Sequence, residues 1–158
     1  FKKNTAYEIR LSLVGSEMCI RDSPTVQLPE YKTSGASGMD LTAFTEKPIN
    51  VKPKTSSLVP TGLSVAFHEN YEIQIRPRSG LAAKSNITVL NTPGTIDSDY
   101  RGEIKVIIYN HGDTDFVINN GDRIAQMVLS PIIRMELEEV KDLPKTIRGE
   151  GGFGSTGK

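Results

Sequence analysis

The chain has no tryptophan, a single cysteine and no net charge over its 158 residues. Because Cys19 stands alone, an internal disulfide is excluded, which is typical of proteins from a reducing compartment. The 19 basic and 19 acidic side chains cancel, so no overall electric field would attract nucleic acid or an anionic membrane. An anionic ligand would therefore have to be held by local groups.

Long apolar runs are missing as well. Those present, such as residues 106–109, are far shorter than the roughly 20 residues that a membrane-spanning helix needs, and no secretory pattern with a cleavage site stands out. The two histidines lie in turn-like contexts, and no group of His, Cys and Asp has the spacing of a metal site. Together these absences predict a soluble cytoplasmic protein with no nucleic-acid or membrane partner.

Short segments with strand periodicity fill most of the chain, and 14 glycines and nine prolines supply turns between them. Apolar residues that alternate or run together predict strands at residues 49–51, 57–59, 63–67, 71–76, 103–109, 115–118, 124–129 and 135–140. Only residues 79–84 look helical, over about one and a half turns. Turns at this short spacing are typical of sandwiches and barrels, so we predict an all-β, jelly-roll-like β-barrel with one short helix.

The first 23 residues differ in character from the rest of the chain. Residues 12–23 look like translated sequencing-adapter sequence, and we interpret residues 1–23 as a non-native segment. Residues 8–14 nevertheless alternate enough to fill a strand position. We expect residues 24–145 to form the β domain and residues 146–158 to form a glycine-rich C-terminal arm.

The C-terminal arm combines groups that suit a phosphate ligand. Its glycines let backbone N–H groups approach an anion closely, while Arg148 offers a planar fork and Ser155 and Thr156 add hydroxyl donors. Phe153 would pack on the body or stack on a flat ligand. Residues 152–158 match the start of the phosphate-loop pattern, but no buried strand leads into them and no helix holds the phosphate, so we reject that site. A disordered terminus remains the alternative.

Two internal segments also suit an anion. Asp40 stands among small residues in segment 34–41, at the head of a strand, although such an Asp is usually part of a turn. Segment 76–83 ends a strand with two arginines before Ser79 and Gly80 open a helical turn, where N–H groups bind anions. The alternative for this second segment is a serine N-cap beside a solvated arginine.

Residues 91–102 suit a nucleoside. They read as a compact hairpin with Asp97 and Asp99 on the same side by strand alternation. The hairpin backbone could read the edge of a pyrimidine, Asp97 could act as a general base, and Tyr100 could pack on a sugar. The alternative is a polar hairpin tip in which Asp and Gly only make the turn.

Residues 120–126 contain a turn that leads into a buried strand, which puts Gln126 inward if Ile124 is inward. The five segments, in this order and spacing, closely resemble those of the trimeric dUTP pyrophosphatase (dUTPase) family over roughly residues 28–158. The resemblance implies a β jelly roll that assembles as a homotrimer, with three active sites at subunit interfaces. It also implies Mg²⁺-dependent hydrolysis of dUTP to dUMP and pyrophosphate, which lowers dUTP and supplies dUMP for dTMP synthesis.

The resemblance also assigns roles around the nucleoside. Asp97 would activate water for in-line attack on the α-phosphorus, and Gln126 would help to place that phosphate or the water. Tyr100 would pack under the deoxyribose and leave no room for a ribose 2′-hydroxyl. The residues expected to read the uracil edge are Asn91, Gly94, Thr95, Ile96 and Lys105. Cytosine would leave groups of such a site without partners, which gives strong discrimination.

Further roles concern the triphosphate. The residues expected to hold the phosphates or to close over the nucleotide are Arg78, Ser79, Gly80, Arg148, Phe153, Gly154, Ser155 and Thr156. The arm would come from another subunit, with Phe153 stacked over uracil. Mg²⁺ would be carried on the triphosphate, with Asp40 supporting the hydrated metal only through water. Asn86 stands where the family commonly has glycine, and Asn tolerates the left-handed conformation.

Two alternatives stay open. A dCTP deaminase resembles this fold and needs a carboxylate beside the pyrimidine, although the Asp97 and Tyr100 hairpin and the Phe153 arm fit the hydrolase better. A nucleotide-sensing module without turnover is the other. Against it, Asp97, Arg78 and Gln126 are all present, so the sequence offers no cause for a loss of catalysis.

Overall fold

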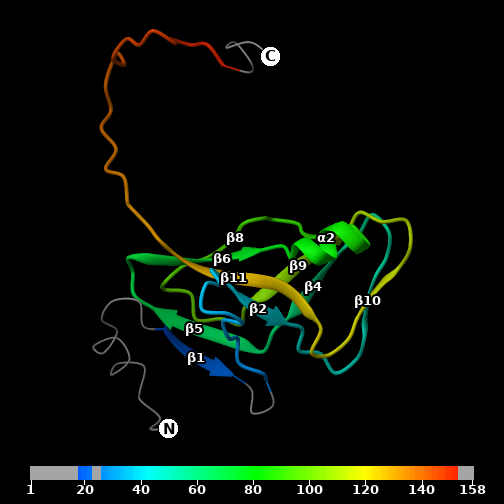
Figure 1. Cartoon of the computed structure of the whole chain (residues 1–158). Coiled ribbons are helices and arrows are strands. Elements are labelled where there is room, and N and C mark those ends of the chain that lie inside the picture. Colours follow the sequence, from blue (N-terminus) through cyan, green and yellow to red (C-terminus); the bar gives the residue numbers. More distant parts are fainter. Residues whose placement is uncertain (1–17, 23–25, 153–158) are drawn as a thin grey trace.

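The computed structural model describes residues 18–22 and 26–152 of the chain (Figure 1). Within these ranges the elements are, in order, β1 (Met18–Asp22), β2 (Met39–Thr42), β3 (Ile49–Val51), β4 (Ser56–Pro60), β5 (Leu63–Phe67), β6 (Tyr71–Arg76), α2 (Ser79–Ser85), β7 (Ile87–Val89), β8 (Gly94–Ile96), β9 (Lys105–Asn110), β10 (Phe116–Ile118) and β11 (Arg123–Pro131). No helix among these residues combines the length and the apolar character needed to cross a membrane.

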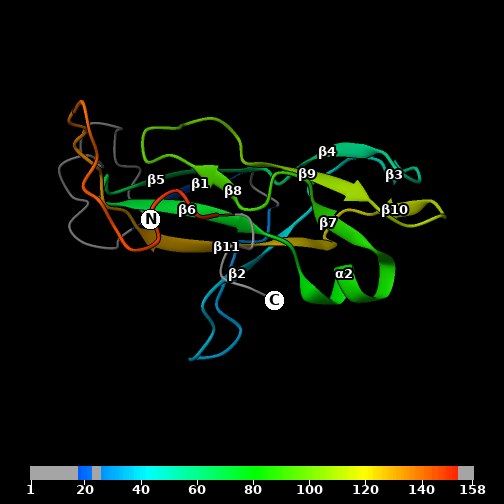
Figure 2. The same cartoon turned by 90° about the horizontal axis from the view of Figure 1, so that it is seen from above.

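Two antiparallel sheets form the body of the molecule (Figure 2). The larger has the strand order β2-β11-β6-β8, in which the long strand β11 pairs with β2 on one side and with β6 on the other. The smaller has the order β4-β9-β7. The pairs β1-β5 and β10-β3 complete the fold. Neighbours in these sheets are far apart in sequence, as in a jelly roll.

Both sheets turn apolar side chains toward one shared core. In β6, Ile73 and Ile75 are 0% and 3% exposed, and in β9, Val106 and Ile108 are 1% and 0% exposed. The residues between them face outward because successive side chains of a strand alternate between its two faces. The buried cluster contains side chains from both sheets. The predicted all-β fold is thereby confirmed.

Most predicted elements are present with bounds shifted by at most two residues. This holds for the strands predicted from residue 49 to residue 129, which correspond to β3, β4, β5, β6, β9, β10 and β11, and for the short helix α2. Strands β7 and β8, of three residues each, were not predicted. The strand β1 was not predicted either, and its backbone pairs with β5. Residues 8–14, the predicted strand position, lie outside the described residues.

The strand predicted at residues 135–140 is wrong. Residues 132–152 form no strand and run away from the sheets (Figure 1). The side chains of Met135 and Leu137 are 84% and 91% exposed, so these residues are not part of the core of the single chain. The apolar alternation that suggested a strand is real, but a strand needs a hydrogen-bonding partner, and no strand within residues 18–22 and 26–152 pairs with these residues.

Asn86 ends α2 in the conformation expected for it. Its φ of 54° and ψ of 34° lie in the left-handed region, and its N–H donates to the carbonyl oxygen of Ala82. Its own carbonyl accepts from the N–H of His111, which joins the end of the helix to the loop after β9. The turn therefore forms with asparagine in the place where the family commonly has glycine.

Candidate active site

Three of the predicted segments meet at the carboxylate of Asp40, on β2. Arg78, just before α2, donates from Nε to Asp40 Oδ1 at 3.2 Å, and Arg123, at the start of β11, donates from Nη1 to Asp40 Oδ2 at 3.1 Å. Gln126 Nε2 lies 3.4 Å from Asp40 Oδ1. We call these four residues the Asp40 cluster.

The cluster fixes the guanidinium of Arg78 from two sides. Besides its bond to Asp40, Arg78 donates from Nη1 to the backbone oxygen of Arg123 at 3.0 Å. The side chains of Asp40 and Arg78 are only 11% and 22% exposed, so these charge-assisted hydrogen bonds are partly shielded from water and stronger than surface ion pairs. A guanidinium held in this way is ready to receive a phosphate without first being ordered.

In this region one expectation is wrong and one residue was missed. Gln126 is exposed although Ile124 is buried, because the pairing of β11 with β2 shifts register between Arg123 and Ala125. This bulge buries Ile124 and Ala125 together and turns Gln126 outward. The sequence analysis also did not select Arg123, which lies within the 120–126 segment but looks there like an ordinary polar residue at a strand start.

The start of α2 lies beside the cluster and is open. Ser79 and Gly80 are exposed, and a Cβ added at Gly80 would meet nothing within 4 Å. The N-cap residue is Arg78 and has no side-chain capping bond, so the alternative of a serine N-cap is wrong. The N–H groups at the start of the helix therefore receive no side-chain cap.

A second group of predicted residues lines a pocket of about 320 Å³. The lining residues are Leu58, Thr95, Ile96, Asp97, Tyr100, Glu103, Ile104 and Lys105. We call this cavity the Tyr100 pocket. Gly94 and Asn91 are not among the lining residues, but a Cβ added at the buried Gly94, which precedes Thr95, would lie 3.3 Å from Asn91 Nδ2. Thr95, Ile96, Asp97, Tyr100 and Lys105, all predicted to contribute to a nucleoside site, thus share one cavity.

The segment that carries Asp97 is not a two-stranded hairpin. Its strand β8 pairs with β6, while β9 pairs with β4 and β7. Asp97 opens a turn in which the N–H of Tyr100 donates to the carbonyl oxygen of Asp97 at 3.1 Å. Strand alternation therefore does not place Asp97 and Asp99. Asp97 is exposed at the mouth of the Tyr100 pocket.

Within one chain the Asp40 cluster and the Tyr100 pocket are separate. Strand β8 runs against β6, with Ile96 opposite Ile73 and Gly94 opposite Ile75. Asp97 therefore lies beyond the Tyr71 end of this pairing, whereas Arg78 follows the other end of β6. Six residues of extended chain span about 20 Å. A site that used both groups would combine them from different copies of the chain.

The C-terminal arm is described only up to Gly152. In that part, Arg148 is exposed and donates from Nε to the carbonyl oxygen of Gly151 at 2.7 Å, within its own turn. It contacts neither the Asp40 cluster nor the Tyr100 pocket in the described chain. The other predicted arm residues lie outside the described residues; they are Phe153, Gly154, Ser155 and Thr156.

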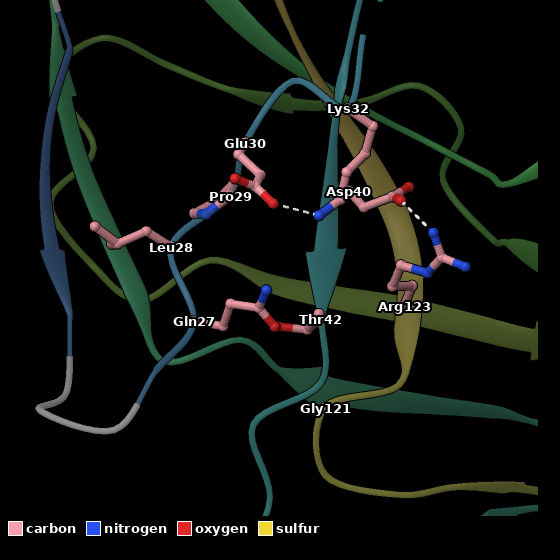
Figure 3. A pocket seen from close by; sticks show the side chains of 9 residues that line it. All are labelled: Gln27, Leu28, Pro29, Glu30, Lys32, Asp40, Thr42, Gly121 and Arg123. Atoms are coloured by element: carbon pink, nitrogen blue, oxygen red, sulfur yellow. Dashed lines mark hydrogen bonds and ion pairs between the residues drawn. The ribbon is translucent and has the colours of Figure 1, made fainter.

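The surroundings of Asp40 do not fit a protein-held metal. A shallow cavity of about 240 Å³ lies between β2, the start of β11 and residues 27–32, with Asp40 and Arg123 on its wall (Figure 3). Both oxygens of Asp40 already accept hydrogen bonds from arginines, and two cations beside a carboxylate repel a third. Residues 18–22 and 26–152 contain no group of three or more His, Cys, Asp or Glu that could hold a metal ion.

Comparisons with known proteins identify the family of the chain. The dUTPase family model matches residues 25–157. A deoxyuridine 5′-triphosphate nucleotidohydrolase of Rickettsia bellii is 60% identical over 131 residues, covering 83% of this chain and 87% of that protein. Its counterpart in Rickettsia conorii is 56% identical over 130 residues, covering 82% and 88%.

Solved structures show the same fold. The dUTPase of Staphylococcus bacteriophage 80alpha, solved with dUPNHPP, superposes with a TM-score of 0.80 at 25% identity and covers 90% of this chain and 99% of that one. A variant dUTPase from phage phi11 of S. aureus, solved to describe a structural Mg(II) ion, has a TM-score of 0.73 at 22% identity, with 82% and 99% covered. The family expected from the five segments is therefore confirmed, and this chain belongs to the dUTPase family.

Proposed function

We propose that the chain is a dUTP diphosphatase, which hydrolyses dUTP to dUMP and pyrophosphate. The observation that carries the proposal is the Tyr100 pocket, where Asp97, Tyr100 and the backbone of β8 share one cavity. Support comes from the 60% identity to a deoxyuridine 5′-triphosphate nucleotidohydrolase over 83% of the chain. The dUMP formed would serve as precursor of dTMP.

In this proposal the nucleoside enters the Tyr100 pocket. The backbone of β8 and of Lys105 reads the uracil edge, with Asn91 beside it. Backbone groups on a sheet edge cannot rotate away, so a cytosine amino group placed against them would leave donors and acceptors without partners. The ring of Tyr100 lies under the deoxyribose. The pocket thus selects both the base and the sugar.

Asp97 is the proposed general base. Its carboxylate is exposed at the mouth of the pocket, so it can accept a proton from a water molecule that attacks the α-phosphorus in line with the departing pyrophosphate. The attack forms a bond from the water oxygen to phosphorus and breaks the bond to the bridging oxygen. Pyrophosphate leaves with the electron pair, and Asp97 holds the proton.

The phosphates would be bound by the Asp40 cluster and the start of α2. Arg78 is oriented by Asp40 and presents a planar fork to phosphate oxygens, and Ser79 and Gly80 add donors from the helix start. Gln126 lies on the outer face beside them. Mg²⁺ bound to the triphosphate would neutralise part of its charge. No step of the proposal uses a metal held by the protein.

The separation of the two groups supports a site shared between copies, as in a homotrimer. Asp97 of one copy would face Arg78 of another, and each copy would contribute to more than one site. The exposed apolar side chains of residues 132–143 support the same arrangement, since a neighbouring copy would cover them. They are Ile133, Met135, Leu137, Val140 and Leu143. The arm of residues 146–158 would then close a neighbour's site, with Phe153 over the base.

The test is pyrophosphate release from dUTP, dCTP, dTTP and UTP in the presence of Mg²⁺. We expect turnover of dUTP and little turnover of the other three. Asp97→Asn should abolish hydrolysis while leaving dUTP binding measurable by calorimetry, because asparagine keeps the shape but cannot accept the proton. Equal turnover of dCTP or UTP would contradict the proposed specificity. Release of ammonia from dCTP would indicate the deaminase instead.

A further inference from the structure

The turn of residues 97–103 holds the ring of Tyr100 against its own backbone. Tyr100 donates its hydroxyl to the carbonyl oxygen of Glu103 at 3.0 Å. A Cβ added at Gly102 would lie only 2.6 Å from Cζ and 3.0 Å from Cε2 of the same ring. The hydroxyl end of the ring therefore occupies the space that the Cβ of any other residue at position 102 would fill.

Hydrogen bonds to its backbone carbonyl groups stabilise the same turn. The N–H of Tyr100 donates to the carbonyl of Asp97, and Arg101 Nη1 donates to the carbonyl oxygens of Ser98 and Tyr100 at 2.7 and 2.8 Å. These bonds join the proposed base Asp97 to the proposed sugar platform Tyr100 within one small unit. A shift of the Tyr100 ring relative to Asp97 must therefore occur mainly through rotation of the side chain.

Glu103 fastens this unit to the rest of the pocket. Its Oε1 accepts from the N–H of Gly62 at 2.9 Å, across 41 positions of sequence, and its Oε2 lies 3.5 Å from Lys105 Nζ. Gly62 sits in the turn between β4 and β5 with a φ of 71°. The side chain of Glu103 is one-third exposed. One side chain thus ties the Tyr100 turn to a second loop and to the start of β9.

We propose that Gly102 and Glu103 are positioning residues. They fix the position of the Tyr100 ring under the sugar, and this position excludes a ribose 2′-hydroxyl. The inference rests on the proposed function, in which Tyr100 packs under the deoxyribose. Gly102 leaves room for the hydroxyl end of the ring because it has no side chain. Glu103 holds the hydroxyl through its backbone carbonyl and the turn through its carboxylate. The two act through Tyr100.

The first test is Gly102→Ala. The added methyl group meets the far end of a side chain, so the ring should swing aside while the backbone keeps its course. We expect the ratio of kcat/KM for dUTP over UTP to fall about tenfold or more, mainly through a higher KM for dUTP. The midpoint of thermal unfolding should change little. An unchanged ratio would overturn the inference.

A double-mutant cycle separates positioning from a general structural defect. Tyr100→Ala removes the ring, so Gly102→Ala should add little further loss of discrimination in that background. Losses that multiply in the double variant would contradict the inference, because they would show that Gly102 acts independently of the ring. Tyr100→Phe keeps the ring and removes only the hydrogen bond of the hydroxyl, so it should lose less discrimination between dUTP and UTP than Tyr100→Ala.

The role of Glu103 has its own matched pair of variants. Glu103→Gln keeps an oxygen that accepts from the N–H of Gly62, whereas Glu103→Ala removes it. We expect the alanine variant to lose discrimination between dUTP and UTP and the glutamine variant to retain most of it. Equal behaviour of Glu103→Ala and the unchanged protein would refute this part.

Binding of dUMP and UMP to the same variants separates this inference from the proposed function. The ratio of the two dissociation constants reports the sugar contact without any turnover. If the unchanged protein prefers dUMP and Gly102→Ala keeps that preference, only the positioning role is overturned. If the unchanged protein binds both equally, Tyr100 does not reject the 2′-hydroxyl, and the inference falls together with that part of the proposed function.

Discussion

Arg78 and Asp40 lie 38 positions apart in the chain, and Arg78 Nε donates to Asp40 Oδ1 across 3.2 Å. The contact joins the strand β2 to the residue that precedes α2, and it is shared with Arg123 on β11. One carboxylate thus orients two cations that come from separate elements. The proposed phosphate site depends on this arrangement, because a guanidinium that is already ordered loses less entropy on binding.

Asp40→Asn tests this dependence. The variant leaves two guanidinium groups without their charge partner, and an amide nitrogen facing one of them has no lone pair to offer. We expect the free energy of unfolding to fall by about 1.5–3 kcal/mol and the KM for dUTP to rise. Denaturant unfolding and steady-state kinetics measure the two effects. Asp113→Asn is the matched control: its ion pair with Lys54 is exposed, so stability should change by less than about 0.5 kcal/mol.

Shortening the chain tests the role of its C-terminal part. If the proposed homotrimer forms, a protein that ends at Lys145 should still assemble as a trimer by light scattering. We expect it to lose roughly 100-fold in the proposed activity, because the arm can no longer position the nucleotide. A protein that ends at Pro131 also loses Ile133, Met135 and Leu137, whose side chains are 84–95% exposed in the single chain. We expect this second protein to dissociate. Full activity of the Lys145 version would contradict the proposed lid.

Ile108→Ala tests the core that carries the site. Ile108 is fully buried in β9, between Ser57 of β4 and Val89 of β7. Removing its outer carbons leaves a cavity, so we expect the free energy of unfolding to fall by about 2–5 kcal/mol. Val117→Ala, at a position 49% exposed on β10, should cost less than about 1 kcal/mol. Equal losses in the two variants, measured by denaturant unfolding, would contradict the assignment of the core.

Asn86 allows a test of backbone strain. With its φ of 54°, an alanine at this position should destabilise the fold by about 1 kcal/mol, since an ordinary side chain is strained in the left-handed region. Asn86→Gly should cost less, because glycine enters this region without a steric penalty. Thermal unfolding of the two variants side by side gives the comparison. A more stable alanine variant would be inconsistent with the observed turn.

Most polar residues of the Tyr100 pocket could be selected from the sequence. Thr95, Ile96, Asp97, Tyr100 and Lys105 lie within one short stretch of chain, and all of them line the Tyr100 pocket. Residues so near in sequence are held together by a single strand and turn. The contribution of Glu103 was not predicted, because its partner Gly62 is 41 positions away and nothing local marks the contact.

By itself, the sequence determined the β architecture, a helix predicted at residues 79–84 and the family, because alternation, turn residues and motif order are local properties of the chain. Tertiary structure alone decided that Gln126 faces outward past a bulge, that Arg123 joins Arg78 on Asp40, and that Asp97 lies at the other end of β6 from Arg78. Each of these depends on register and strand pairing between distant segments. A one-residue shift of register changes which side chains meet, and a local sequence pattern does not predict the register.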